Sequence, residues 1–349
     1  MLLLRLTPDG ASRTMAESPD RERRRRWAAE ISARAAAFWT PARRRKLFGD
    51  LQLVLPPWEA APLLRALGLI NGDGSMPPAS VRKYMQIGHM VLLLEPLLRR
   101  LAAERPVVRV LDAGCGSSYL TLLLAWCFRH RWQRPAELLG VDRDPVVVRR
   151  CRKRTALVDL DDALRCEVAP LETLDVPAAW TRAFGAPPPA DRPLDVLVAL
   201  HACDTATDDA LALGVRLGAE LLAAAPCCQA ELAQAWAALA DAGAAGPFAP
   251  VWRSNHLRRE AGATLTDALR TLLLRGCGYE VTPMEFVGSS HTPKNTLLRA
   301  VRVDTPDPEA FAEYAALRRT LGGADIRLAR ILPEPHHSAL LAAAPPDDP

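Results

Sequence analysis

Residues 106–116 read PVVRVLDAGCG, and this stretch decides the fold. An apolar run ends there in Asp112 and in two glycines, Gly114 and Gly116. A short, continuous apolar run that is closed by glycines is typical of a parallel strand with both faces covered. Glycine lets the backbone turn tightly and approach a ligand closely, where a Cβ atom would clash. The stretch therefore predicts a buried strand followed by a ligand-binding loop.

Strands and helices alternate after this stretch. Further apolar strands are expected in AELLGVD (136–142), LRCEVAPL (164–171), LDVLVAL (194–200) and AELLAAAPCC (219–228), with helices at 117–132, 144–158 and 205–218. Asp144 is the expected cap of the second of these helices, with Pro145 at its first position. Alternation of this kind predicts an α/β, Rossmann-like, mostly parallel sheet with helices on both faces. Residues 278–303 contain two β-type runs around a polar loop and predict a terminal antiparallel hairpin.

The segments on either side of the predicted sheet have a different character. We expect residues 1–20 to be disordered and residues 21–105 to form a helical, basic region. Within it, Ser80 is a candidate cap for a helix from 81 to about 103 that is broken or bent near Pro96. The sheet domain should cover 106–304, with a helix and a loose tail at 305–349. Met15 is an alternative start to Met1.

The charge is uneven along the chain. Residues 1–106 hold 18 Lys and Arg against 10 Asp and Glu, a balance of +8, which leaves −4 for the remainder of a chain with net charge +4. A basic N-terminal part suggests an anionic partner such as RNA. The alternative is a solvated, arginine-rich helical surface.

Cysteine usage and hydropathy indicate the compartment. Eight cysteines in 349 residues are too sparse for a disulfide scaffold. Cys127, Cys151 and Cys277 lie in apolar runs, where a thiol behaves as a small hydrophobe. We therefore expect a reducing, cytoplasmic setting. No stretch approaches the roughly 18 apolar residues of a membrane helix, so we expect no membrane interaction, and we infer no obligate protein partner.

A second acidic strand end completes a nucleoside-binding pattern. Asp142 ends the second predicted strand, thirty positions after Asp112. A carboxylate at Asp142 can accept hydrogen bonds from both ribose hydroxyls of an adenosine, and Asp112 could accept from a ligand ammonium. The loop has the pattern G-x-G without the third glycine of a dinucleotide site, which favours S-adenosylmethionine over NAD. We therefore assign cofactor binding to Asp112, Gly114, Gly116 and Asp142.

Five motifs carry a resemblance to a known family: VLDAGCGSSYLT, LLGVDRD, ALHACDTATDDAL, APCCQ and SSHTPKNTLLRAV. Over roughly residues 80–303 the chain resembles the class I S-adenosylmethionine-dependent methyltransferases of the methyltransferase-like 25 type. It is more remotely similar to eukaryotic tRNA acceptor-stem 2′-O-methyltransferases, which also place a His-x-Cys segment after the fourth strand. The resemblance implies methyl transfer and a seven-stranded sheet that ends in the hairpin. Because CEVAPLETL lacks the usual acidic residue at the adenine position, adenine contact should rest on backbone and on Pro170 or Leu171.

The fourth predicted strand ends in ionisable groups, in the stretch VLVALHACDTATDDAL (196–211). In class I methyltransferases this strand end faces the sulfonium of the cofactor. Transfer of a methyl group needs an in-line nucleophile and often a group that accepts its proton. His201 is the best candidate for the base, since its ordinary pKa is about 6.5. Asp204 could orient His201 or bind the acceptor, while capping of the next helix is the alternative for Asp204 and Thr205.

The fifth predicted strand ends in two cysteines and a glutamine. Cys227 is a candidate nucleophile, as in some pyrimidine methylases; otherwise Cys227, Cys228 and Gln229 shape the acceptor pocket. The set His201, Cys203, Cys227 and Cys228 has ligand types that suit zinc. Adjacent cysteines on a strand point in opposite directions, however, so we expect no metal site.

The hairpin loop SSHTPKN (289–295) is the last candidate for substrate contact. His291, Lys294 and Asn295 could reach over the acceptor pocket, with a solvated turn as the alternative. Together these features predict an S-adenosylmethionine-dependent methyltransferase whose acceptor is RNA (tRNA or rRNA). The alternatives are a protein or small-molecule methyltransferase, or a non-catalytic scaffold that keeps the cofactor fold.

Overall fold

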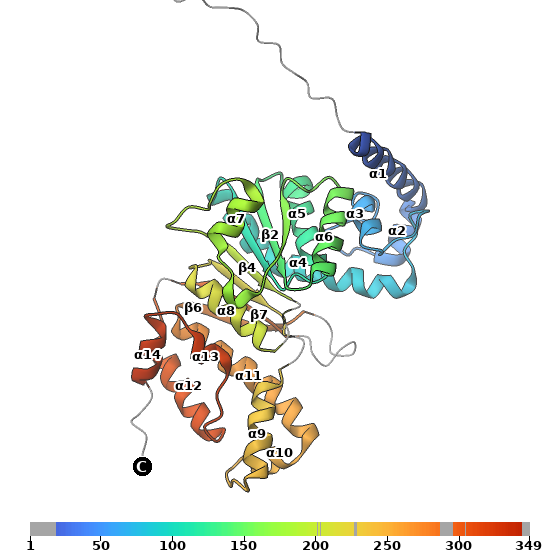
Figure 1. Cartoon of the computed structure of the whole chain (residues 1–349). Coiled ribbons are helices and arrows are strands. Elements are labelled where there is room, and N and C mark those ends of the chain that lie inside the picture. The colour runs from blue at the N-terminus through green and yellow to red at the C-terminus, as the bar shows by residue number, and fades with distance from the viewer. Residues whose placement is uncertain are drawn as a thin grey trace, which may run out of the picture.

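The computed structural model describes residues 19–343 apart from 201, 203, 227, 228, 287–295 and 304. A seven-stranded mixed sheet with the order β3-β2-β1-β4-β5-β7-β6 forms its centre (Figure 1). The strands are β1 (Val108–Ala113), β2 (Ala136–Asp142), β3 (Leu164–Val168), β4 (Val196–Ala199), β5 (Leu221–Ala224), β6 (Tyr279–Glu285) and β7 (Thr296–Arg302). Strands β1 to β5 are parallel, and β7 runs antiparallel to both β5 and β6. The α/β, Rossmann-like fold and the terminal hairpin expected from the sequence are confirmed.

Helices precede, connect and follow the strands. Before the sheet come α1 (Pro19–Phe38), α2 (Pro41–Phe48), α3 (Ala61–Ala66) and α4 (Pro78–Glu104). Between strands lie α5 (Tyr119–Trp126), the π-helix η1 (Cys127–Trp132), α6 (Pro145–Leu157), the 3₁₀ helix η2 (Leu171–Thr173), α7 (Val176–Phe184), α8 (Thr205–Arg216), α9 (Glu231–Asp241), α10 (Ala249–Arg253) and α11 (Asn255–Gly276). After β7 come α12 (Pro308–Thr320), α13 (Arg327–Ile331) and α14 (His336–Ala343).

Both faces of the sheet are covered by apolar clusters. Along β4, Val196 and Val198 belong to one cluster, whereas Leu197 and Ala199 belong to the other, because successive side chains in a strand point to opposite faces. The first cluster includes side chains from α1 to α6, and the second includes side chains from α7 to α14. A strand buried on both faces needs an unbroken apolar run, which is why these segments could be recognised in the sequence.

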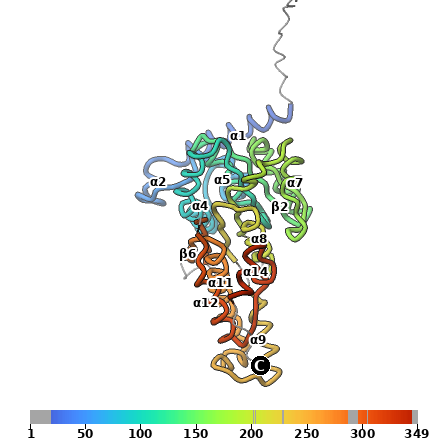
Figure 2. Tube along the Cα trace, turned by 90° about the vertical axis from the view of Figure 1, so that its left-hand side faces the viewer, coloured from blue at the N-terminus to red at the C-terminus, as the bar shows by residue number. Residues whose placement is uncertain are grey.

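The N-terminal helices share the first cluster with β1 and β2. Next to this cluster, the hydroxyl of Tyr119 donates to the carbonyl oxygen of Leu67 at 3.2 Å. Nζ of Lys83, in α4, lies 3.6 Å from the centre of the Tyr119 ring. Viewed from the side, the molecule is elongated, with α1 near one end and α9 near the other (Figure 2).

Helix boundaries confirm some local predictions and correct others. Asp144 caps α6 as expected, since its carboxylate accepts from the backbone N–H of Val146 at 2.7 Å. Helix α4 begins at Pro78 with Pro77 as its N-cap residue, so the prediction that Ser80 caps this helix is wrong. Proline is well suited to the first turn, whose N–H groups have no partner within the helix. Helices α13 and α14 follow α12 and were not predicted from the sequence.

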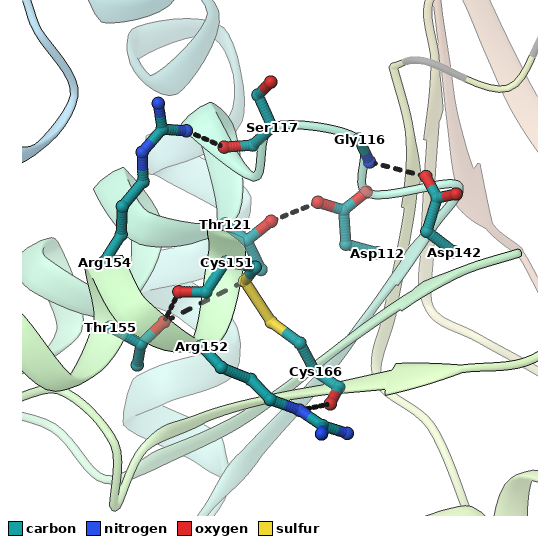
Figure 3. Close-up of a disulfide and its surroundings, with 10 residues drawn as sticks. All are labelled: Asp112, Gly116, Ser117, Thr121, Asp142, Cys151, Arg152, Arg154, Thr155 and Cys166. Atoms are coloured by element: carbon teal, nitrogen blue, oxygen red, sulfur yellow. Dashed lines mark hydrogen bonds between the residues drawn. A yellow bond between two sulfur atoms is a disulfide. The ribbon is translucent and has the colours of Figure 1, made fainter. Parts of the chain in front are cut away.

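The cysteines differ in part from the sequence interpretation. Cys151 of α6 forms a disulfide with Cys166 of β3, so the interpretation of Cys151 as an unpaired buried thiol is wrong (Figure 3). Cys127 and Cys277 are free and buried, as expected. Among the helices that the structure describes, none combines the length and the apolar character that crossing a bilayer requires.

Candidate active site

The loop after β1 takes the backbone conformation that its glycines permit. Gly114 has a φ of 71° and Gly116 a φ of 51°, in the left-handed region that favours glycine. A Cβ atom on Gly114 would lie 3.4 Å from backbone atoms of Ala202, which follows β4. The loop therefore runs close to the end of the neighbouring strand, as expected for a segment that lines a ligand site.

Asp142 connects the end of β2 to this loop. One oxygen of its carboxylate, Oδ2, accepts from the backbone N–H of Gly116 at 2.9 Å (Figure 3). The other oxygen, Oδ1, accepts from the backbone N–H of Asp144 at 2.9 Å. Each carboxylate oxygen has a second lone pair, so Asp142 keeps capacity for further donors such as hydroxyl groups.

Asp112 lies beneath the loop rather than at the surface of the site. Its side chain is 4% exposed and accepts a hydrogen bond from the hydroxyl of Thr121 (Figure 3). Burial raises the pKa of the Asp112 carboxyl to about 7, and the negative charge of Asp142 acts in the same direction, against the Thr121 hydrogen bond. Its contact with a ligand ammonium stays a prediction.

A cavity of about 420 Å³ opens at the carboxyl ends of β1 to β4, where ligands bind in open α/β sheets. It is lined by Gly114, Asp142, Arg143, Ala169, Pro170, Leu171, Glu172, Ala202, Thr205 and Ala206. Of the predicted cofactor residues, Gly114, Asp142, Pro170 and Leu171 thus meet in one place. Sequence reasoning missed Glu172, which brings an acidic side chain to this wall from η2. The sequence could have indicated Glu172, because it directly follows Pro170 and Leu171, the residues predicted to contact adenine.

Asp204 takes a different role from the predicted helix cap. It precedes α8 with a φ of 52°, but its side chain makes no capping hydrogen bond to that helix. Its Oδ1 instead accepts from the backbone N–H groups of Ala230 at 2.8 Å and Glu231 at 3.3 Å, where α9 begins. Thr205 is the first residue of α8, so the alternative that it caps this helix is wrong. Asp204 therefore fixes the segment after β5 against the segment after β4.

Several predicted residues lie outside the described part of the chain. They are His201, Cys203, Cys227, Cys228, His291, Lys294 and Asn295. Their assignments as base, nucleophile and substrate contacts stay predictions. Within residues 19–343, less the masked positions, no group of three or more His, Cys, Asp or Glu is arranged to hold a metal ion.

Gln229 is buried next to an ion network that the sequence did not reveal. Its Nε2 donates to Oδ2 of Asp267 at 3.0 Å. Arg270, which is fully buried in α11, donates to Asp208 at 2.9 Å, to Asp267 at 3.1 Å and to the backbone oxygen of Asp204 at 3.1 Å. Asp208 and Arg270 are 62 positions apart, so only the packing of α11 against the strand ends brings them together.

Comparison with known protein families finds a match for the central part of the chain. Residues 82–235 match the family described as "Methyltransferase domain". This match covers less than half of the chain, and the strand order and the glycine loop described above lie largely within it. No curated protein matches the sequence significantly.

The chain is also similar to solved structures, at low sequence identity. One is a crystal structure of a putative S-adenosyl-L-methionine-dependent methyltransferase from Methanococcus maripaludis (12% identity, 64% of this chain, 90% of that chain, TM-score 0.37). Another is the methyltransferase domain of METTL16 (14% identity, 78% and 92%, TM-score 0.39). A third is the SAH-bound Podospora anserina methyltransferase PaMTH1 (12% identity, 86% and 100%, TM-score 0.37).

Proposed function

We propose that this protein binds S-adenosylmethionine and transfers its methyl group to RNA. One observation carries the proposal. The carboxylate of Asp142 accepts a hydrogen bond from the Gly114–Gly116 loop beside a cavity of about 420 Å³. Both lie inside the region that matches a methyltransferase domain. Pockets of this size at strand ends suit a nucleoside-sized ligand.

Each wall of the cavity suits one part of the cofactor. Asp142 accepts hydrogen bonds from the ribose hydroxyls, and Gly114 leaves room for the ligand to approach the backbone. Pro170 and Leu171 pack on the adenine, and Glu172 accepts a hydrogen bond from its amine. The cofactor supplies an electrophilic methyl group on a sulfonium.

The acceptor side is built from the segments that follow β4 and β5. His201 is the proposed proton acceptor, and Cys227 the proposed alternative nucleophile. Asp204 is proposed as a positioning residue, because its carboxylate holds the backbone at the start of α9. A fixed geometry between acceptor and methyl group is the main requirement of an in-line transfer.

Basic residues on the N-terminal helices support RNA as the acceptor. Arg45 and Lys46 of α2 are exposed. Next to the glycine loop, Lys83 and Arg154 both approach the ring of Tyr119, and Arg154 donates to the backbone oxygen of Ser117 at 2.9 Å. Cationic side chains of this kind contact phosphates and supply much of the affinity for nucleic acid.

Calorimetry on the purified protein tests the cofactor half of the proposal. We expect S-adenosylhomocysteine to bind, and Asp142→Ala to weaken binding by at least about tenfold, because hydrogen bonds to a charged acceptor are lost. Asp241→Ala, which removes an exposed carboxylate at the end of α9, is the matched control and should bind like the wild type. Equal affinity in Asp142→Ala would contradict the assigned site.

Incubation with labelled cofactor tests the acceptor. The substrates are separate pools of cell RNA, protein and metabolites, and we expect label in RNA. His201→Ala should slow transfer by about 10²–10⁴, the usual contribution of a general base. Label only in the protein or metabolite pool would contradict RNA as the acceptor. Cofactor binding without transfer to any pool would indicate a scaffold.

A further inference from the structure

A second cavity, of about 310 Å³, lies between the carboxyl end of β5 and α11. Pro226 and Gln229 line it from the segment after β5, and Asp267 lines it from α11. Pro283 of β6 and Thr296 of β7 complete it on the side of the hairpin. A volume at the lower end of the range for ligand sites suits one chemical group the size of a nucleobase or a side chain.

The amide of Gln229 leaves an acceptor without a partner. Its orientation is fixed, because Nε2 donates to the carboxylate of Asp267, which can only accept. The amide oxygen Oε1 is buried and has no hydrogen-bond partner among the residues that the structure describes. Gln229 itself is only 7% exposed. A buried acceptor without a partner is costly, and Gln229 lines a cavity whose ligand could supply the missing donor after a small side-chain adjustment.

Most of the other polar groups around the cavity also offer acceptors, while the hydroxyl of Thr296 can donate or accept. Thr264 and Thr271 line it, but their hydroxyl hydrogens are used within α11, on the backbone oxygens of Glu260 and Asp267. Their oxygens keep only acceptor capacity. Glu260 adds a second carboxylate, and the two prolines of the lining have no N–H. These groups therefore favour a ligand with hydrogen-bond donors.

Hydrogen bonds link the segments that line this cavity to those that line the cavity beside Asp142. Thr205 lines the cofactor cavity and directly follows Asp204. Asp204 accepts from Ala230, which directly follows Gln229. Arg270 holds the backbone of Asp204 and the carboxylate of Asp267 together. The second cavity is thus placed beside the strand ends where the methyl acceptor is proposed to enter.

We propose that this cavity recognises an amino or amide group of the methyl acceptor, one with at least two N–H hydrogens. Such a group can donate to Oε1 of Gln229 and to the carboxylate of Asp267 at once, which a hydroxyl with its single hydrogen cannot do. In RNA, the matching groups are the exocyclic amines of cytosine, adenine and guanine, whereas uracil has none. The proposal rests on the proposed methyl transfer, and its RNA part rests also on the proposed acceptor.

Binding of matched oligonucleotides tests this proposal. The probes are 12-mers of cytidine against uridine, and of adenosine against inosine, which exchange the amine for a carbonyl and keep the phosphate number. At one salt concentration, with S-adenosylhomocysteine present, we expect each amino-bearing oligomer to bind at least about fivefold more tightly. Gln229→Leu should remove this preference. Gln234→Leu, an exposed position on α9, is the control and should retain it.

The outcomes separate this proposal from the function on which it rests. Equal affinities within both wild-type pairs would overturn it without any variant, and so would a preference that Gln229→Leu leaves intact. A third outcome is that no oligomer binds, but label passes to nitrogen atoms in the cell protein pool and Gln229→Leu abolishes this transfer. RNA is then the wrong acceptor, and the recognition of N–H donors is supported. Cofactor binding without oligomer binding or transfer to nitrogen would contradict both.

Discussion

Asp112 shows how burial gives one carboxylate in the site a sensitivity to pH. It lies beneath the glycine loop, with the hydroxyl of Thr121 as its hydrogen-bond donor. A carboxylate in such surroundings loses hydration, and the nearby Asp142 disfavours a second negative charge. With a pKa of about 7, Asp112 is partly protonated near neutral pH.

This pKa predicts the pH dependence of cofactor binding. A cation in the neighbouring cavity favours the charged form of Asp112, so binding should release a proton and affinity should rise with pH. Between pH 6 and 7.5 the charged fraction of a group with a pKa near 7 grows roughly eightfold. We therefore expect the Kd for S-adenosylmethionine to fall by about fivefold over that interval, in calorimetry with two buffers of different ionisation enthalpy.

Asp112→Asn provides the control for this prediction. The amide cannot titrate, so the affinity of this variant should stay constant over the same interval. A wild-type Kd that is unchanged between pH 6 and 7.5, with no proton release, would show that Asp112 is not coupled to the cofactor.

At the scale of residues, the sequence predicted those parts of the site whose signal is local. Gly114 directly follows an apolar strand and Asp142 is the last residue of one, and a strand end in a parallel sheet has a known place. Asp267 and Arg270 lie in the middle of a helix, where nothing in their neighbourhood marks them as part of a buried network. Their role depends on the packing of α11, which a local pattern does not contain.

The contact between α11 and α12 depends on the absence of a side chain. A Cβ atom on Gly276, the last residue of α11, would lie 2.3–2.6 Å from three ring atoms of Phe311 in α12. Phe311 is only 4% exposed and has little room to move. The two helices can therefore pack at this distance only with glycine at position 276.

Gly276→Ala should lower the free energy of unfolding by about 1–3 kcal/mol, because the added methyl overpacks the contact. Urea denaturation measures the change. Gly88→Ala is the matched control, since nothing lies within 4 Å of a Cβ atom at this position in α4. It should leave stability unchanged or raise it by up to about 1 kcal/mol, the difference in helix propensity. Equal midpoints for both variants would contradict the packing described here.

At the scale of elements, the central strands β1, β2, β4 and β5 were predictable because burial on both faces demands continuous apolar runs. The start of α4 could not be predicted, because Pro77, Pro78 and Ser80 are all acceptable at a helix start and only packing decides between them. Helices α13 and α14 are short, and their sequence has too few turns to show a periodic pattern.

Charge on the N-terminal helices gives a prediction for the whole molecule. If Arg45 and Lys46 contact phosphates, replacing both with Ala should weaken RNA binding. The slope of log Kd against log salt should also become shallower, by about 0.7 for each lost contact with a single strand. Fluorescence anisotropy over a salt series measures both effects. Arg216→Ala with Arg319→Ala removes the same charge from exposed positions on α8 and α12 and should leave the slope unchanged.

The first apolar cluster includes side chains of the basic N-terminal helices and of α5, the helix that follows the glycine loop. Lys83 and Leu67 contact Tyr119 a few residues beyond Gly116, so the N-terminal helices pack directly against the start of α5. Substitutions that change the charge of the N-terminal surface must therefore preserve its packing against α5. Substitutions of exposed charged residues can therefore change what this surface binds and leave the core intact. Loss of the N-terminal helices would instead expose the apolar side chains of α5 that they cover.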